Sequence, residues 1–593
     1  MTDSAALPQW DLERLYASPE AWETDFQKIR PLAEIFASYR GRLGESAEIL
    51  AAAIAALDDF ERLGEKVYVY AHLRSDENTA DSANRARVDR VVGLFAELSE
   101  ISAWFEPEIM AIAPAKMDQF LADPALKLYR RSVEELLRER PHTLSEPEER
   151  LLGTFGEVLG APSKTFSLIN DADLRFGKIR NAKGKLEELT HENYGKFMED
   201  PDRKIRRNAF RHLYDVYTGM RNTLASTLDA TVKKHVISAR VRHYPSALGA
   251  SLFSDKISED VYRNLIASVH DRIGYLHDYM DFRRSALHLK QMDMYDVYAP
   301  LQSNCRAEYS FEEAAQLVRD ALKPLGEEYC RILDTAFTDR WVDAAKRRGK
   351  RSGAYSSGCY DSLPYILLNY SGTLNDVFTL AHELGHSMHS YLSNRTQHYH
   401  YADYCIFLAE VASTTNETLL FEHMMKQTGD PELRRYLLCH QLNEIRGTIF
   451  RQTQFAEFEL KMHELAAAGT PLSADLLDEE YYKLNAFYYG PALAKADRRI
   501  AVEWARIPHF YYNFYVYKYA TGMSAALRLA KGILEGGNAE RTAYLNFLSA
   551  GDSYDPLDIL RDAGVDLARP EPVCEALDYF GNTVRRLRDE WHA

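Results

Sequence analysis

The run Thr379-Leu-Ala-His-Glu-Leu-Gly-His-Ser-Met-His389 decides most of what the sequence predicts. His382 and His386 are four residues apart, so on a helix their rings project from one face and can bind the same metal ion. Glu383 stands beside the open coordination position of such a metal, where it can take a proton from bound water. This is the His-Glu-x-x-His pattern of a zinc hydrolase.

The flanking residues favour a helix. Thr373 is a predicted N-cap, and Asp376 occupies the capping-box position three residues later. The segment 377–392 contains no proline, and Gly385 is its only weak helix former. A glycine is tolerable there if another element packs closely against it. We therefore expect the two histidines to lie on a regular helix.

A catalytic zinc needs a third protein ligand and leaves a fourth position for water. The metzincin spacing is excluded, because it would require glycine where the chain has His389 and histidine where it has Leu392. Downstream, the run 407–417 is apolar and helix-compatible, with Glu410 at its centre, and residues 394–404 are long enough for the chain to turn back. A buried lone carboxylate is costly unless it is paired or metal-bound. We predict Glu410 as the third ligand.

Two further residues are expected beside the ligands. Glu417 lies two turns after Glu410 on the same face and is predicted to hydrogen bond a ligand histidine. His389, three residues after His386, is near the ligand face and is expected to pack or hydrogen bond there.

The strings His-Glu-Leu-Gly-His-Ser-Met-His-Ser at 382–390 and Phe-Leu-Ala-Glu-Val-Ala-Ser-Thr at 407–414 resemble the oligoendopeptidase F family, part of the thimet oligopeptidase group of zinc metallopeptidases. The likeness extends to segments 10–16, 353–355, 364–370 and 507–517. The resemblance implies a mainly α, ellipsoidal peptidase with one Zn²⁺ per chain. It also implies a deep channel that admits short unfolded peptides and excludes folded proteins.

Helical periodicity dominates the rest of the chain. The pattern weakens near residues 174–189, where Asn181-Ala-Lys-Gly-Lys185 predicts the turn of a small hairpin. We place a soft domain boundary near residues 190–200. Residues 1–195 are predicted to form an N-terminal helical domain that caps the channel, and residues 196–593 the zinc metallopeptidase domain.

A short β-prone run, Leu363-Pro-Tyr-Ile-Leu-Leu-Asn-Tyr370, precedes the predicted zinc helix. We expect a small β-sheet there, with an extended edge that pairs with a peptide backbone through main-chain hydrogen bonds. An ordinary sheet strand is the alternative. Candidate substrate contacts in this region are Gly353, Tyr355 and Tyr365.

The segment His509-Phe-Tyr-Tyr-Asn-Phe-Tyr-Val-Tyr-Lys-Tyr519 carries more phenols than core packing requires. A donor is needed to share the negative charge of the tetrahedral intermediate with zinc. His509 and Tyr512 are three apart and share a helix face, and by resemblance they match the position of the transition-state donors. Tyr515 and Tyr517 are competing candidates, because the chain lacks the longer glycine-containing loop of related sequences.

The composition of the chain limits the kinds of partner that it can bind. With 593 residues, 46% of them hydrophobic, the chain can bury a large core, and its formal net charge of −16 argues against nucleic acid and anionic membranes. No stretch is apolar for long enough to cross a bilayer. The start of the chain lacks the features of a secretion signal, and the six scattered cysteines suit reduced thiols, so we expect a cytoplasmic protein.

These observations predict a zinc endopeptidase acting on short unfolded oligopeptides, its oligomeric state left open. Two alternatives remain. A zinc exopeptidase of the carboxypeptidase kind would trim peptide ends and needs a charged pocket for a terminal group. A peptide-binding protein with an idle zinc site is disfavoured by Glu383, because binding alone requires no general base.

Overall fold

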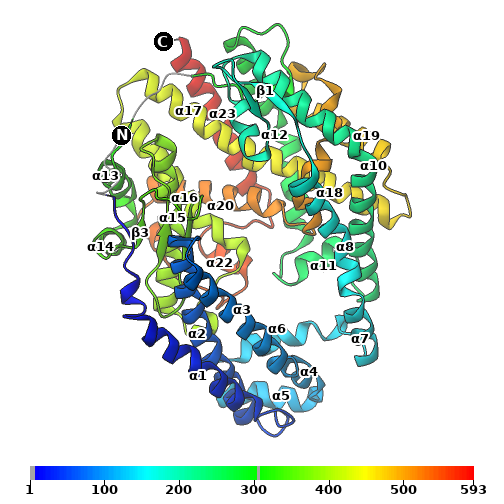
Figure 1. The fold of residues 1–593 in the computed structure, drawn as a ribbon, viewed down its shortest axis with the longest axis vertical. Helices are drawn as coiled ribbons and strands as arrows, with labels where there is room; N and C mark the ends of the chain where they lie inside the picture. Colours follow the sequence, from blue (N-terminus) through cyan, green and yellow to red (C-terminus); the bar gives the residue numbers. More distant parts are fainter. Residues whose placement is uncertain (1–6, 303–307, 593) are drawn as a thin grey trace. The chain divides into compact units, whose positions relative to one another are not determined.

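The computed structural model describes residues 7–302 and 308–592, so the first residues of the chain and Cys305 lie outside the described part. Helices make up most of the described chain, and its strands form one two-stranded and one three-stranded sheet (Figure 1). The predicted mainly α fold is confirmed. No helix in the described ranges combines the length and the apolar character that crossing a membrane requires.

The described chain divides into two compact units, each made of three stretches of sequence. The first unit comprises residues 1–141, 307–423 and 529–564, and the second comprises 142–306, 424–528 and 565–593. The predicted domain boundary between residues 195 and 196 stays a prediction.

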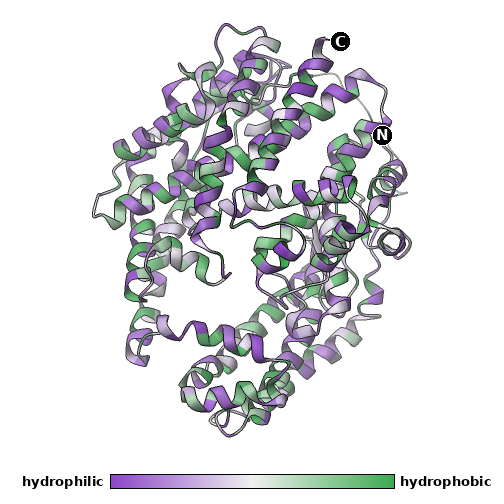
Figure 2. Ribbon diagram, turned by 180° about the vertical axis from the view of Figure 1, so that it is seen from behind, coloured by the Kyte–Doolittle hydropathy of each residue, from purple (hydrophilic) through white to green (hydrophobic). Residues whose placement is uncertain are grey.

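The first unit begins with a layer of three long helices, α1 (Pro19–Ala37), α2 (Ala47–Glu77) and α3 (Ser82–Ser102), drawn in blue in Figure 1. The side chains of Ser18, Ser46 and Asp81 cap their first turns. Apolar and polar residues alternate along these helices at helical spacing (Figure 2), and the buried faces form one hydrophobic core. The remaining helices of this unit include α4 (Phe105–Ala111), α5 (Pro114–Ala122), α6 (Arg130–Arg138), α13 (Phe311–Leu322), α14 (Glu327–Thr338), α15 (Leu374–Thr396), α16 (Ile406–Gln427), α21 (Asn538–Leu548) and α22 (Pro556–Asp562).

The three-stranded sheet of the first unit has the order β3-β5-β4, with β3 (Val342–Asp343), β4 (Tyr355–Ser357) and β5 (Tyr365–Leu367). The small sheet predicted before the zinc helix is therefore present. The prediction that the 363–370 run offers a free edge is wrong, because β5 pairs with β3 on one side and β4 on the other. The edge strands of this sheet are β3 and β4.

Tyr365 consequently belongs to the core and does not line a cleft. It is 1% exposed, packs edge-on against Trp10, and donates a hydrogen bond from its hydroxyl to the Asp11 carbonyl at 3.3 Å. Its predicted contact with substrate is not supported, since the pleat turns its ring toward the N-terminal helices.

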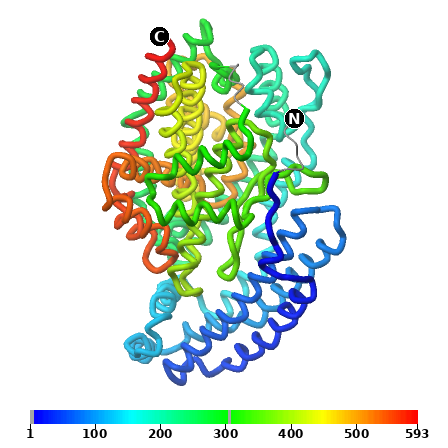
Figure 3. The backbone as a smooth tube through the Cα atoms, turned by 90° about the vertical axis from the view of Figure 1, so that its left-hand side faces the viewer, coloured from blue at the N-terminus to red at the C-terminus, as the bar shows by residue number. Residues whose placement is uncertain are grey.

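The second unit contains a hairpin and a set of long helices. Strands β1 (Lys178–Arg180) and β2 (Leu186–Glu188) pair antiparallel around the predicted turn, where Gly184 has φ 74°. Figure 3 shows the C-terminal α23 (Glu571–His592, red) running alongside α17 (Pro431–Ile445, yellow). The other helices of this unit include α7 (Glu146–Thr154), α8 (Gly156–Ser167), α9 (His191–Met198), α10 (Arg203–Val241), α11 (Ala247–Phe253), α12 (Glu259–Ala286), α18 (Arg451–Ala467), α19 (Ala474–Tyr489) and α20 (Tyr517–Glu535).

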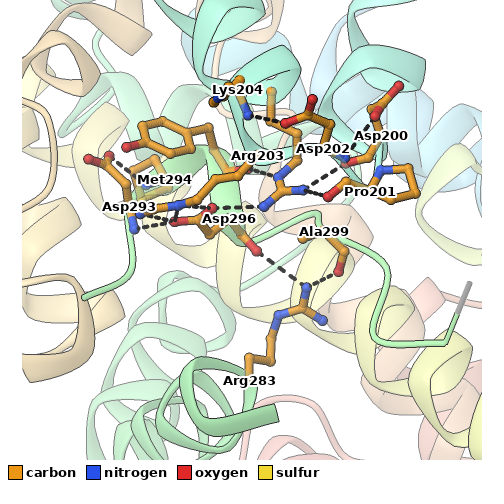
Figure 4. A network of polar contacts seen from close by, with 12 residues as sticks. Asp200, Pro201, Asp202, Arg203, Lys204, Arg283, Asp293, Met294, Asp296 and Ala299 are labelled. Atoms are coloured by element: carbon orange, nitrogen blue, oxygen red, sulfur yellow. Dashed lines mark hydrogen bonds and ion pairs between the residues drawn. The ribbon is translucent and has the colours of Figure 1, made fainter. Parts of the chain in front are cut away.

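A buried ion network fixes the start of α10 in this unit (Figure 4). Asp296, which is fully buried, accepts hydrogen bonds from Arg203 at 2.8 Å and from Arg206 at 2.9 Å. Arg206 also donates to the carbonyls of Asp200 and Pro201. A buried carboxylate is stable only when its oxygens are paired in this way, so the network joins α10 firmly to the segment around residue 296.

Candidate metal centre

Helix α15 begins as the sequence predicts. Thr373 is its N-cap, and its hydroxyl accepts a hydrogen bond from the Asp376 amide at 3.2 Å while the Asp376 carboxylate accepts one from the Thr373 amide at 2.9 Å. The helix continues to Thr396 without interruption. His382 and His386 therefore lie one turn apart on one face.

Gly385 sets how closely α16 approaches α15. A Cβ atom at this position would stand 2.5 Å from the Ser413 Cα and 2.9 Å from the Ala412 carbonyl oxygen. The Asn416 amide donates to the Ala381 carbonyl at 3.1 Å, which fixes the same contact one turn away. Another helix does pack closely at this glycine, which makes the glycine tolerable, and this contact brings the face of α16 that carries Glu410 against the histidines.

Three side-chain atoms converge between these helices. The Nε2 atoms of His382 and His386 are 3.2 Å apart, and Glu410 Oε2 lies 3.5 Å from the first and 3.7 Å from the second. These three residues form a group able to hold a metal ion, with the ligand atoms within 4.8 Å of one another. Zinc bonds of about 2.0–2.1 Å at tetrahedral angles require ligand atoms roughly 3.4 Å apart. The donor set and its spacing fit zinc.

Each histidine ring also has a hydrogen bond outside the three-residue group. His382 Nδ1 donates to Glu417 Oε1 at 2.6 Å, as the sequence predicts, and His386 has a backbone hydrogen bond at Ala409. Burial lowers the pKa of His382, but the hydrogen bond and charge of Glu417 outweigh it and raise this pKa to about 9. Burial, and then the charge of His382, lower the pKa of His386 to about 4. Both contacts orient the rings toward the shared point.

Glu383 borders the same space as the two histidines and Glu410. It is 6% exposed and accepts a hydrogen bond from the backbone of Ser356 on β4. Burial raises the pKa of Glu383 to about 7, against the lowering effect of His382. A carboxyl with a pKa near neutrality is suited to exchange protons with water and a leaving amine. The contact from Ser356 was not predicted, since nothing local in the sequence pairs these residues.

His389 packs and does not hydrogen bond. Its ring stacks on Tyr404 with ring centroids 3.6 Å apart, and its centroid lies 5.2 Å from that of the Phe547 ring. Neither ring nitrogen has a hydrogen-bond partner among the described residues, and burial lowers the pKa of His389 to about 3. Of the two roles expected for this residue, the structure supports packing.

A cavity of about 940 Å³ opens in front of this group within the first unit. Its walls come from α2, the β4 region, α15, the 399–404 segment and the start of α16. Tyr355 lines the cavity, and its hydroxyl donates to Asp76 at 2.8 Å. Gly353 is not among the described lining residues; its φ of 88° and its carbonyl bond to Asn369 mark it as a turn residue.

The predicted donor segment belongs to the second unit. His509 lies in a short 3₁₀ helix, Pro508–Tyr511. The centroid of its ring is 5.9 Å from the centroid of the Tyr512 ring and 6.2 Å from that of the Tyr515 ring. Tyr512 is 58% exposed, whereas Tyr517 is fully buried at the start of α20. The rings of His509 and Tyr512 are neighbours, as expected, but Tyr512 follows the last residue of the 3₁₀ helix, so the predicted shared helix face is not formed. The roles of these four residues toward the metal group stay predictions.

The turn that carries these rings is strained. Asn513 and Phe514 have φ of 50° and 58°, which is unfavourable for residues other than glycine. Two contacts hold them: the Phe514 amide donates to Glu459 Oε1 at 2.7 Å, and the Ser251 hydroxyl donates to the Asn513 carbonyl at 2.6 Å. Glu459 is fully buried. Sequence reasoning missed this carboxylate, because it lies far away in the chain and in no motif.

Comparisons with known proteins agree with this geometry. Residues 196–579 match peptidase family M3 and residues 108–176 match the Oligopeptidase F family. The chain is 44% identical to oligopeptidase PepF of Bacillus subtilis (strain 168), covering 98% of this chain and 87% of that protein. It is 41% identical to group B oligopeptidase PepB of Streptococcus agalactiae, covering 98% and 96%.

Solved structures give the same result. The crystal structure of oligoendopeptidase-F from Enterococcus faecium is 37% identical, with a TM-score of 0.75 over 97% of this chain and 99% of that one. A Chlamydophila abortus protein, also 37% identical, matches with a TM-score of 0.93 over 98% of both chains. The chain therefore belongs to peptidase family M3 and is a metalloendopeptidase that acts on peptides.

Proposed function

We propose that the metal is zinc, one ion per chain, held by His382, His386 and Glu410, and that the enzyme cleaves internal bonds of short unfolded oligopeptides. The observation that carries this proposal is the convergence of two Nε2 atoms and one carboxylate oxygen at tetrahedral spacing. Nitrogen and oxygen donors of this kind suit zinc. The relatives that carry the names oligopeptidase and oligoendopeptidase favour short peptides as substrates.

The chain's own residues have defined roles in this proposal. A zinc ion bound there supplies polarisation of the scissile carbonyl and activation of water. Glu383 takes the proton of the attacking water and delivers it to the leaving amine. His509 and Tyr512 donate hydrogen bonds to the developing oxyanion, with Tyr515 as the competing donor. Glu417 keeps the His382 ring in its binding orientation.

The proposal also covers the substrate contact, the domain arrangement and the location of the enzyme. The edge strand β4, with Tyr355, pairs with the substrate backbone near Glu383. Residues 1–195 form an N-terminal domain that caps a deep channel, and residues 196–593 form the catalytic domain. The enzyme works in the cytoplasm. The two alternatives are an exopeptidase, which the family match disfavours, and a binding protein with an idle zinc site, which the presence of Glu383 disfavours.

Cleavage of an internally quenched peptide blocked at both ends tests the proposal. The expected result is internal cutting that stops with a chelator and returns with zinc, read by fluorescence and by mass spectrometry of the products. Trimming of free peptides without cutting of blocked ones would assign an exopeptidase. Cutting restored by another metal but not by zinc would refute the zinc assignment.

A further inference from the structure

One face of α2 lines the cavity that contains the metal-binding group. Asp58, Glu61, Glu65 and Tyr68 all border this cavity, and their spacings of three, four and three place them in a single stripe along the helix. Three of the four carry a carboxylate. Carboxylates at such spacings repel one another and weaken the helix that carries them.

The basic residues of the same part of α2 are engaged elsewhere. Arg62 pairs with Asp361 at 2.6 Å and lies 4.6 Å above the Tyr360 ring. Lys66 lies over the ring of Tyr16 at 4.8 Å. No lysine or arginine occurs among the described residues that line the cavity. The stripe therefore has no lysine or arginine partner within the described wall of the cavity.

Individual contacts support the same conclusion. Glu61 forms neither a hydrogen bond nor an ion pair with any part of the chain that the structure describes, while Glu65 accepts a hydrogen bond from the Tyr399 hydroxyl at 2.9 Å. Asp58 is only 7% exposed; its Oδ1 accepts from His400 Nδ1 at 2.8 Å, and its Oδ2 has no partner among residues 7–302 and 308–592. Glu61 and Glu65 are exposed, so a cation that enters the cavity can reach their carboxylates.

We propose that Glu61 and Glu65 form a subsite for a positively charged group of the peptide substrate, namely the side chain of an arginine or lysine. A guanidinium or ammonium between the two carboxylates would relieve their repulsion and satisfy their oxygens. Tyr399 already fixes Glu65, so one of the two acids is held in place for this contact. The inference rests on the proposed function, because it assigns substrate preference to the same cavity.

The pKa values of several acids in this wall are raised. Glu61 and Glu65 have exposed side chains, yet the cavity walls displace bulk water around them. This loss of surrounding water, followed by the charges of Asp58 and Glu65, raises the pKa of Glu61 to about 7, while His400 opposes the shift. Loss of surrounding water also raises the pKa of Glu65 and of Asp403, another residue that lines the cavity. A bound cation would favour the charged forms of all these groups.

Matched substrates test this subsite. A series of end-blocked, internally quenched peptides places arginine, its neutral isostere citrulline, or glutamate at each position around the cleaved bond. At one position we expect kcat/KM for arginine to exceed that for citrulline by about tenfold, mainly through KM, with glutamate the poorest. The preference should shrink when salt is raised, since screening weakens the charge pairing. Equal rates for arginine and citrulline at every position would overturn the proposal.

Variants identify the residues responsible. In the double variant Glu61→Gln/Glu65→Gln the ratio of arginine to citrulline kcat/KM should fall toward 1, and in Glu61→Lys/Glu65→Lys glutamate should replace arginine as the preferred residue. Asp59→Asn is the matched control, because Asp59 is exposed on α2 and does not line the cavity. An unchanged ratio in both double variants would refute the assignment. Thermal unfolding and zinc content of each variant exclude misfolding as the cause.

Two further arms separate the possible outcomes. Peptides with a free N-terminus and no basic side chain reveal whether the subsite binds an α-ammonium group instead, which would keep the cationic subsite but change the source of the charge. Neutral blocked peptides monitor the proposed function itself. If they are not cleaved at all, the endopeptidase proposal fails; if they are cleaved but arginine gives no advantage, only the subsite proposal fails.

Discussion

The metal-binding group and the 507–519 segment are built in opposite ways. His382, His386 and Glu410 lie on two regular helices whose contact is set by a glycine and an asparagine. The 507–519 segment is a short 3₁₀ helix and a turn with two residues in the left-handed region, held by a buried carboxylate. The first region holds its ligands on rigid helices, whereas the second holds a strained backbone next to exposed hydrogen-bond donors. The following predictions test that difference.

The largest effect is expected in the metal-binding region. Glu383→Gln keeps the shape of the side chain but removes its capacity to accept a proton, so turnover should fall by about 10²–10⁴-fold. Zinc content should stay at one per chain, because Glu383 is not one of the three converging ligands. His382→Ala, in contrast, should lose both zinc and activity. Turnover of Glu383→Gln close to that of the wild type would contradict its role.

Substitutions in the strained segment should weaken binding of the transition state and leave the binding of substrate and metal unchanged. Tyr512→Phe removes one donor and should lower kcat by about 10²–10³-fold with little change in KM or zinc content. Tyr515→Phe serves as the comparison, since its ring lies at a similar distance from His509. A larger loss in Tyr515→Phe would move the donor role to that residue, and no loss in either would remove the segment from the mechanism.

Gly385→Ala tests the rigid contact between α15 and α16. The added methyl group would meet the backbone of Ser413, so the helices must separate, at a cost of about 1–3 kcal/mol in the free energy of unfolding and with weaker zinc binding. Gly93→Ala on α3 is the control, because nothing lies within 4 Å of its Cβ position. It should be neutral or stabilise by about 0.4–1 kcal/mol. Equal effects of the two changes, measured by denaturant unfolding and zinc titration, would argue against a rigid contact.

The last prediction concerns the carboxylate that holds the strained turn. Burial raises the pKa of Glu459 to about 8, whereas an unfolded glutamate titrates near about 4.3. The folded protein therefore binds this proton more tightly, and the resulting stability is complete below pH ~4.3 and is lost as the pH rises toward ~8. Glu459→Gln should abolish this loss of unfolding free energy at higher pH, while its amide oxygen still accepts the hydrogen bond from the Phe514 amide. Parallel unfolding free energies for both proteins from pH 5 to 8 would contradict this.

The sequence predicts much of the metal-binding region because its signals are local. Histidine spacing, the Thr373–Asp376 cap and the single glycine at 385 are all readable within one helix, and Glu410 and Glu417 follow from the periodicity of the next. The turn at 181–185 was predictable for the same reason.

Features that depend on distant pairing were not predictable. Strand β5 becomes central only because the two-residue strand β3 pairs with it, and so short a strand leaves no pattern in the sequence. Glu459 reaches Phe514 from 55 positions away, and Ser356 reaches Glu383 from a separate strand. The acidic stripe on α2 has readable spacing, but only the fold reveals that it faces the cavity of the metal group.

Anomalous diffraction at the zinc absorption edge from crystals of the zinc-loaded protein tests the central claim most directly. The account predicts one peak per chain, about 2.0–2.1 Å from His382 Nε2, His386 Nε2 and a Glu410 oxygen, with His389 uninvolved. A peak at another site, or one bound through His389 in place of Glu410, would contradict it.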